Sequence, residues 1–324
     1  MKHLEIERIR QTRGASLLLF ITDRCPVACA HCSVDSRPDS PMISDFELFG
    51  ELLLGICKHE SVKVVGISGG EPFTERRGLT LACEALLNSN KRIVIYTSGV
   101  WATKVDSEPQ WIIEILKSCS TVYLSTDSFH QNRVPVVHFQ RAALEIVKAG
   151  AWLVVQTLEV EKTTSLLEMV FGVDFSGCAE VVGISPLQNG RGQNIFDLKG
   201  HQPASAMGTC SLAVTPVIRY DGNISSCCNE DIIMGKGPAR FRSKVQNALD
   251  LRRTLIQFKH DPVMKSVAQV GLGQILIHPK LDTLNKKKYL NNCELCWKVM
   301  EKFPDLPETD RLIHAIAELG EPNE

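Results

Sequence analysis

The stretch SLLLFITDRCPVACAHC, residues 16–32, joins a run of apolar residues to a loop with three cysteines. Its first seven residues predict a buried β-strand, because strands covered on both faces are apolar throughout. Further apolar runs occupy residues 61–68, 92–97, 121–126, 152–157 and 180–185. A spacing of about thirty residues suits a strand followed by a crossover helix. We therefore predict an α/β fold built as a partial (β/α)6 TIM-like barrel.

Local signals place the ends of some elements. Ser44 and Glu47 form a capping-box pattern ahead of an apolar helix, and Gly150 stands where a C-cap glycine belongs. After about residue 200 the alternation stops, and a hairpin turning at Asp221-Gly222 precedes helical sequence at 243–277. We predict two domains, residues 1–200 and a smaller α+β domain at residues 201–324.

The composition excludes several classes of function. The formal net charge of the 324 residues is −1, which argues against nucleic acid or an anionic membrane as partner. No apolar run approaches the ~18 residues of a membrane span, and the N-terminus lacks the apolar core of a signal peptide. Twelve cysteines without an export signal predict a cytoplasmic protein whose cysteines are metal ligands or reactive thiols. The segment before residue 16 is expected to be too short for a domain that binds a leader peptide.

Cys25, Cys29 and Cys32 form a C-x3-C-x2-C pattern in the loop after the first predicted strand. Three thiolates on one loop can hold three irons of a 4Fe–4S cubane and leave the fourth iron open. Structural zinc would require a fourth nearby ligand, and His31 is awkwardly placed between two ligating cysteines. The pattern therefore favours a cluster with one open iron.

This pattern resembles that of the radical S-adenosylmethionine (SAM) superfamily, and the resemblance implies cleavage of SAM to a 5′-deoxyadenosyl radical. Gly69-Gly70-Glu71-Pro72 resembles the GGEP motif, which receives the SAM amino group: the glycines allow close approach, and a carboxylate meets an ammonium. The resemblance further implies that Ser98, in the polar step after the third strand, contacts the cofactor. It also implies that Ser125 and Asp127 contact the ribose, that Arg191 contacts the SAM carboxylate and that His31 contacts the adenine. For Ser125 and Arg191, ordinary polar positions at strand ends are the alternative. Trp101 and His130 are further candidates for lining the cavity.

A second set of cysteines lies in the last third of the chain: Cys210, Cys227, Cys293 and Cys296. A hairpin with one thiolate on each strand, closed by a distant C-x2-C, can fully ligate a second, auxiliary 4Fe–4S cluster. A structural zinc site with four thiolates is the alternative. The arrangement resembles the twitch domain, the short form of the SPASM extension of radical SAM enzymes.

Cys228 is left over from this set. Adjacent strand residues point to opposite faces, so Cys227 and Cys228 are not expected to bind one cluster. The segment around them, with Cys293-x2-Cys296, resembles the radical SAM peptide epimerases of the epipeptide class. That resemblance makes Cys228 the hydrogen-atom donor; an inert buried cysteine is the alternative.

Three functions remain open from the sequence. The first is Cα epimerisation, L to D, of a ribosomally made peptide. The second is radical dehydrogenation of a small-molecule alcohol or aminocyclitol, or oxidative peptide crosslinking, with the auxiliary cluster accepting an electron. The third is a non-catalytic metal-binding module, against which the GGEP-like loop argues. Either enzyme requires an external electron donor such as flavodoxin or ferredoxin.

Overall fold

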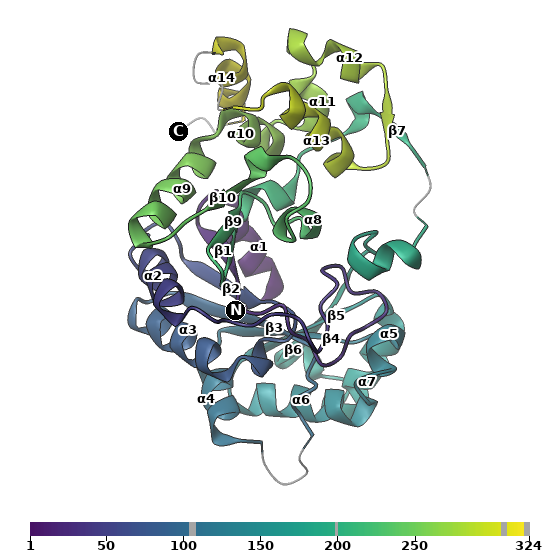
Figure 1. The fold of residues 1–324 in the computed structure, drawn as a ribbon. Helices are drawn as coiled ribbons and strands as arrows, with labels where there is room; N and C mark the ends of the chain where they lie inside the picture. Colours follow the sequence, from purple (N-terminus) through teal and green to yellow (C-terminus); the bar gives the residue numbers. More distant parts are fainter. Residues whose placement is uncertain (104–107, 198–199, 306–309, 321–324) are drawn as a thin grey trace.

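A curved sheet of mostly parallel strands organises the protein (Figure 1). The structure is a computed structural model that describes residues 1–103, 108–197, 200–305 and 310–320. Six of its strands run parallel in chain order: β1 (Ser16–Phe20), β2 (Val64–Ser68), β3 (Arg92–Thr97), β4 (Thr121–Ser125), β5 (Trp152–Thr157) and β6 (Ala179–Gly183). Each lies within or next to a predicted apolar run. The parallel α/β sheet and the partial barrel are confirmed.

Five helices cover the outer face of this sheet: α2 (Phe46–Cys57), α3 (Arg76–Asn88), α4 (Gln110–Ser118), α6 (Val136–Lys148) and α7 (Val160–Phe171). Their apolar stripes and the outward strand residues form the main core, which includes Phe49, Leu79 and Phe139. The helix cap predicted at Ser44 is wrong by one residue, because Asp45 is the N-cap and accepts a hydrogen bond from the Leu48 amide. The predicted glycine after α6 is confirmed, since Gly150 has φ +89°.

A short N-terminal helix, α1 (His3–Gln11), covers part of the inner face of the sheet. Its Ile6 packs with inward residues of successive strands, including Val64, Val94 and Tyr123. Side chains alternate along a strand, so these residues share one face with Gly66, Ser68 and Tyr96. The helix therefore closes the amino-terminal side of the barrel interior and leaves the other side, at the carboxyl ends of the strands, for a site.

The predicted hairpin belongs to the same sheet. It consists of β8 (Val217–Arg219) and β9 (Asn223–Ser225), turning at Gly222 with φ +82°, and β10 (Arg242–Lys244) adds the edge. Strand β8 pairs in parallel with β1. The helical sequence begins after β10, as α9 (Ala248–His260), α10 (Pro262–Gln269) and α11 (Leu272–Ile275).

A second apolar core lies beyond the sheet, in the upper part of Figure 1. It draws on residues from Ala204 to Ile316, and its elements include α12 (Asp282–Asn285), α13 (Asn292–Lys302), α14 (Arg311–Glu318) and the pair β7 (Gln202–Pro203) and β11 (Lys288–Tyr289). Two short helices, α5 (Ser128–Gln131) and α8 (Glu230–Ile233), complete the fold. The alternation of strand and helix patterns thus ends near residue 200, where the second core begins. The main sheet nevertheless takes three further strands from beyond that residue.

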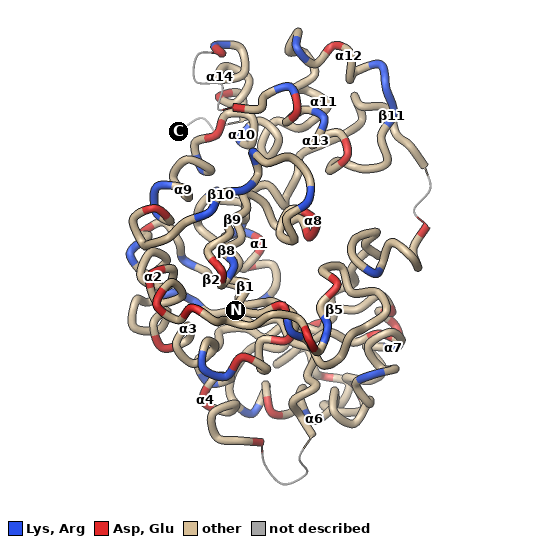
Figure 2. Tube along the Cα trace, viewed as in Figure 1, with Lys and Arg blue, Asp and Glu red and all other residues tan. Residues whose placement is uncertain are grey.

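Charged residues of both signs are interspersed along the chain (Figure 2). Among the described residues, no helix is long and apolar enough to cross a membrane.

Candidate active site

The three N-terminal cysteines lie at the carboxyl end of β1 and line a cavity of about 330 Å³. The loops after β2, β3 and β4 converge on the same cavity, as expected where parallel strands end. Sequence-predicted residues along its wall are Cys25, Cys29, Cys32, His31, Gly69, Gly70, Ser98, Ser125 and His130. The fold therefore brings together the residues of four separate sequence motifs.

The raised pKa values of these thiols mean that they would ionise only beside positive charge, such as that of a bound metal cluster. Burial raises the pKa of Cys25 to about 11 and that of Cys29 to about 12, so both remain protonated at neutral pH without added positive charge. A tetrahedral zinc ion would bring its sulfur ligands to roughly 3.8 Å from one another. Cys29, His31 and His130 are close enough for one metal ion, since their ligand atoms lie within 4.8 Å of one another. The three thiols of the loop would hold a cluster of several irons only with Cys25 and Cys32 as the further ligands.

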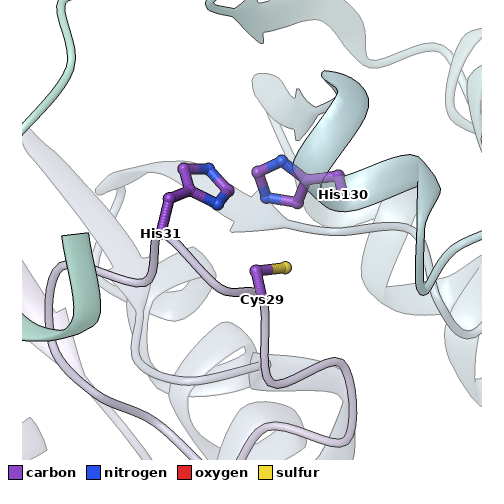
Figure 3. A group of neighbouring side chains, drawn as sticks. All are labelled: Cys29, His31 and His130. Atoms are coloured by element: carbon purple, nitrogen blue, oxygen red, sulfur yellow. The ribbon is translucent and has the colours of Figure 1, made fainter. Parts of the chain in front are cut away.

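A histidine pair lies over Cys29 (Figure 3). His31 and His130 both contact Asp127, with Nε2–Oδ2 and Nδ1–Oδ1 distances of 3.3 and 3.0 Å. Burial alone would raise the pKa of Asp127, but the two neighbouring imidazoles and the His130 amide, which donates to Oδ1 at 2.9 Å, lower it, so the carboxylate stays ionised. Phe129 stacks on His31 with a ring separation of 4.9 Å. Asp127 therefore fixes the two imidazoles at the cavity wall and does not itself line it.

Glu71 lies behind the cavity wall. Its side chain is 1% exposed and accepts hydrogen bonds from the Ser98 amide and hydroxyl at 2.8 and 2.5 Å and from Thr97 Oγ1 at 2.8 Å. Burial raises its pKa despite these bonds. Pro72 starts a buried 3₁₀ turn (Pro72–Thr74). What the loop presents to the cavity is the backbone of Gly69 and Gly70, where an added Cβ would collide with the backbone of residues 22–24.

Arg191 reaches the cysteine loop from the far side of the barrel. Its Nε and Nη2 donate to the Cys29 carbonyl at 2.9 and 2.7 Å, and its Nη1 donates to Asp35 Oδ1 at 2.6 Å. Its own amide donates to the Cys32 carbonyl at 2.9 Å. Trp101, another sequence candidate, does not line the cavity and donates instead to Oγ1 of Thr97, which does. Arg191 thus braces the loop that carries the cysteines.

Replacing Arg191 with methionine is expected to weaken iron retention by the N-terminal site. The substitution removes charge-assisted hydrogen bonds worth about 1.5–3 kcal/mol each, so the loop loses its brace. Iron per chain after gel filtration should fall, whereas Arg253→Met, at an exposed arginine of α9, should retain wild-type iron. Equal iron in the two variants would contradict the bracing role.

The second set of cysteines also converges. The pKa of Cys296 is raised well above its usual value by burial and by the nearby Cys227, Cys210 and Cys293. The Asn229 side-chain amide donates to Cys293 Sγ at 3.5 Å. The four thiols lie near one another at the second core, with Cys227 and Cys296 buried and Cys210 and Cys293 half-buried.

Cys228 faces a different space from Cys227, but the expected strand alternation is not the reason, because β9 ends at Ser225 and both cysteines follow it. Cys227 packs into the second core, whereas Cys228 lines a chamber of about 200 Å³ on the inner face of the barrel. Arg10 of α1 holds the thiol, with Nη2 3.8 Å from its Sγ, and donates through Nη1 to Glu7 at 2.7 Å. Burial raises the pKa of Cys228 to about 12, so it carries its S–H hydrogen at neutral pH.

The chamber adjoins the cavity at the cysteine triad. Ser68, Tyr96 and Glu230 line both spaces, so they form the wall where the two meet. None of these three, nor Arg10, was predicted from the sequence. Arg10 precedes the first strand, and Glu230 lies about 160 residues beyond Ser68 in the chain, at a distance where local patterns carry no information. Cys228 lines only the chamber, and the three N-terminal cysteines line only the neighbouring cavity.

Glu230 should make stability depend on pH. Burial raises its pKa from 4.5 to about 7, so the folded protein holds a proton that the unfolded chain releases. This contribution is complete below pH 4.5 and is lost as pH rises through about 7, at up to about 1.4 kcal/mol per pH unit. Between pH 5 and 8, the free energy of unfolding measured in urea should decline less for Glu230→Gln than for wild type. If the free energies of the two proteins fall in parallel with pH, Glu230 does not have a raised pKa.

Parts of the chain are similar to known proteins in sequence, and the fold is similar to that of solved structures. Residues 19–159 match the family described as the radical SAM superfamily. A stretch of 112 residues is 25% identical to YydG of Bacillus subtilis (strain 168), named for peptide biosynthesis, and spans 34% of this chain and 35% of YydG. The crystal structure of Streptococcus suis SuiB with its precursor peptide SuiA aligns with a TM-score of 0.57 and 13% identity, over 91% of this chain and 79% of SuiB. The structure of anSMEcpe with AdoMet and the peptide Cp18Cys aligns with a TM-score of 0.52 and 14% sequence identity, over 94% of this chain and 99% of anSMEcpe. At sequence identities this low, the structural similarity shows a shared fold only.

Proposed function

From the match of residues 19–159 to the radical SAM superfamily, we propose that the protein is a radical SAM enzyme that epimerises a residue of a ribosomally made peptide, with Cys228 as hydrogen-atom donor. One observation carries the proposal: the Cys228 thiol lines a chamber that meets the cavity of the cysteine triad at a shared wall. Epimerisation needs hydrogen to leave one face of a Cα atom and return to the other. Two reactive groups on opposite sides of a bound residue provide this geometry.

Cys25, Cys29 and Cys32 would hold the 4Fe–4S cluster that a radical SAM domain requires. With SAM, that cluster supplies a 5′-deoxyadenosyl radical when given an electron. Ser98, Ser125 and the backbone of Gly69 and Gly70 line the space for SAM, and His31 and His130 form its edge. Glu71, Asp127 and Arg191 act indirectly in this proposal: Glu71 holds the Ser98 turn, Asp127 holds the histidines and Arg191 holds the cysteine loop.

The substrate residue would occupy the chamber with its Cα between the shared wall and Cys228. Breaking the Cα–H bond yields 5′-deoxyadenosine and a Cα radical, and transfer of the S–H hydrogen from Cys228 yields the D-residue and a sulfur radical. The S–H bond and the peptide Cα–H bond are of similar strength, because the Cα radical is stabilised by its amide neighbours, so a thiol can give its hydrogen atom to this radical. Return of the thiol then takes one electron and one proton. The raised pKa of Cys228 favours the protonated thiol that the next cycle needs.

The auxiliary cysteines would place a second cluster close to the chamber. Cys227 precedes Cys228 directly, and Cys210, Cys293 and Cys296 surround it. These four cysteines would hold a 4Fe–4S cluster, which would supply electron-transfer chemistry beside Cys228, and an external donor such as flavodoxin or ferredoxin would supply the electrons. The resemblance of this segment to a twitch domain supports the assignment.

The same proximity favours a second candidate function. If the cluster at Cys210, Cys227, Cys293 and Cys296 accepts the substrate electron, the product is an oxidised small molecule or a crosslinked peptide. Cys228 would then be dispensable. The peptides bound to SuiB and anSMEcpe, and the naming of YydG, favour a peptide over a small molecule.

Mass and chirality separate the two functions. The reconstituted protein would be incubated with SAM, a reductant and peptides from short reading frames next to its gene. Epimerisation gives a product of unchanged mass that releases a D-amino acid on hydrolysis. Loss of two hydrogens with all residues in the L form would support oxidation and contradict the proposal.

A further inference from the structure

Two histidines and a cysteine at the wall of the triad cavity have the geometry of a site for a single metal ion (Figure 3). One ligand atom from each of Cys29, His31 and His130 lies within 4.8 Å of the other two. A tetrahedral zinc ion holds sulfur at about 2.3 Å and nitrogen at about 2.0–2.1 Å, which places such ligands roughly 3.3–3.6 Å from one another. Shifts of about 1 Å would therefore close these three atoms around one ion.

The surrounding contacts orient the two imidazoles as a metal site requires. Asp127 is 1% exposed, and its Oδ2 lies 3.3 Å from His31 Nε2 and its Oδ1 3.0 Å from His130 Nδ1. A histidine that binds a metal through one nitrogen almost always presents the other to a carboxylate or carbonyl, which fixes the orientation of the ring. The two rings are nearly perpendicular, at 85°, with centroids 4.7 Å apart, and Phe129 stacks on His31. A carboxylate shared by both imidazoles is thus already in place beside the thiol.

Two separate segments of the chain supply the ligands. Cys29 and His31 belong to the loop after β1, and His130 belongs to the short helix α5 after β4. Within the loop alone, His31 is awkwardly placed for zinc because it stands between two cysteines. The fold supplies a further ligand from another strand end, which the spacing within the loop does not indicate.

We propose that Cys29, His31 and His130 bind one zinc ion in the chain that has not received its N-terminal iron–sulfur cluster. One thiolate and two imidazoles are ligands that zinc accepts, and a water molecule would complete the tetrahedron. Binding releases the thiol proton of Cys29 to solvent. The zinc ion and the cluster exclude each other because both need the Cys29 sulfur, so zinc opposes cluster assembly and keeps the chain inactive. This exclusion rests on the cluster assignment of the proposed function, whereas zinc binding itself does not.

Zinc content in the absence of iron tests the ligands. The full chain would be stripped of iron with a chelator without oxygen, incubated with zinc chloride, passed through gel filtration and analysed for metal. His130→Ala and His31→Ala should each retain about one zinc ion fewer per chain than wild type. His260→Ala, at an exposed histidine that ends α9, should match wild type. Zinc bound by the second set of cysteines is common to all four proteins and cancels. Equal zinc in wild type and in either histidine variant with a wild-type circular dichroism spectrum would overturn the site.

Cys25→Ala separates the zinc site from the cluster. Cys25 is one of the three expected cluster ligands but is not one of the three ligands of the proposed zinc ion. The variant should therefore lose iron from the N-terminal site after reconstitution, yet retain as much zinc as wild type when iron is absent. Loss of zinc as well as iron would overturn the zinc site. Retention of both metals would support the zinc site and contradict the cluster assignment of the proposed function.

The order of metal loading tests the mutual exclusion. When zinc is added before iron and sulfide, wild type should take up about four iron atoms fewer per chain than His130→Ala, because zinc occupies Cys29 only in wild type. The second set of cysteines is the same in both proteins and does not affect the difference. Equal iron uptake by the two zinc-treated proteins would overturn the exclusion.

Discussion

Replacing Cys228 with alanine is expected to abolish the D-residue while SAM cleavage continues. The substitution removes the only sulfur that lines the chamber among the described residues, but leaves the triad cavity intact. D-product should fall by at least about a hundredfold, as for loss of other side chains that act in the chemical step. 5′-Deoxyadenosine should still form, because the Cα hydrogen is still removed.

Cys228→Ser sharpens this test. An O–H bond is too strong to give up its hydrogen atom to a Cα radical, so serine should behave as alanine although it keeps the size and polarity. Cys178→Ala, at a half-buried cysteine outside both cavities, is the matched control and should retain full epimerisation. A wild-type yield of D-residue from Cys228→Ala would exclude Cys228 as donor and favour the oxidative alternative.

Replacing Cys29 with alanine should have the largest effect, complete loss of 5′-deoxyadenosine. Cys29 is 8% exposed, and with Cys25 and Cys32 it is one of the three thiols at the end of β1. Its loss should remove one cluster, so that iron falls from about eight to about four per chain. Cys57→Ala, at a half-buried cysteine that ends α2, should keep the wild-type iron content and the wild-type release of 5′-deoxyadenosine. Iron near eight with no SAM cleavage would instead place the defect in SAM binding.

The barrel was predictable because its signals are local. Each parallel strand is a short apolar run, and the loops that follow β1 and β2 carry recognisable motifs. Ser44 and Asp45 are both good N-cap residues, and only the backbone conformation at Asp45 decides between them. Boundaries of this kind depend on a single dihedral angle and are therefore harder to predict than the elements themselves.

The parts that depend on distant contacts could not be predicted. Hairpin β8–β9 joins the sheet beside β1, and Arg219 then pairs with Asp23 at 2.8 Å, just before the cysteine loop. Nothing near Arg219 in the sequence points to this partner, which lies 196 residues away. For the same reason the sequence identified Arg191 as a polar residue of the site but did not show that it contacts the Cys29 carbonyl.

Reaction in D2O tests the central claim most directly. If Cys228 exchanges its S–H hydrogen with solvent and returns it to the substrate, each converted peptide residue gains one deuterium at Cα and has the D configuration. The account predicts a mass gain of one unit per event, with one 5′-deoxyadenosine released for each. A product that lacks solvent deuterium, or that has lost two hydrogens, would contradict it.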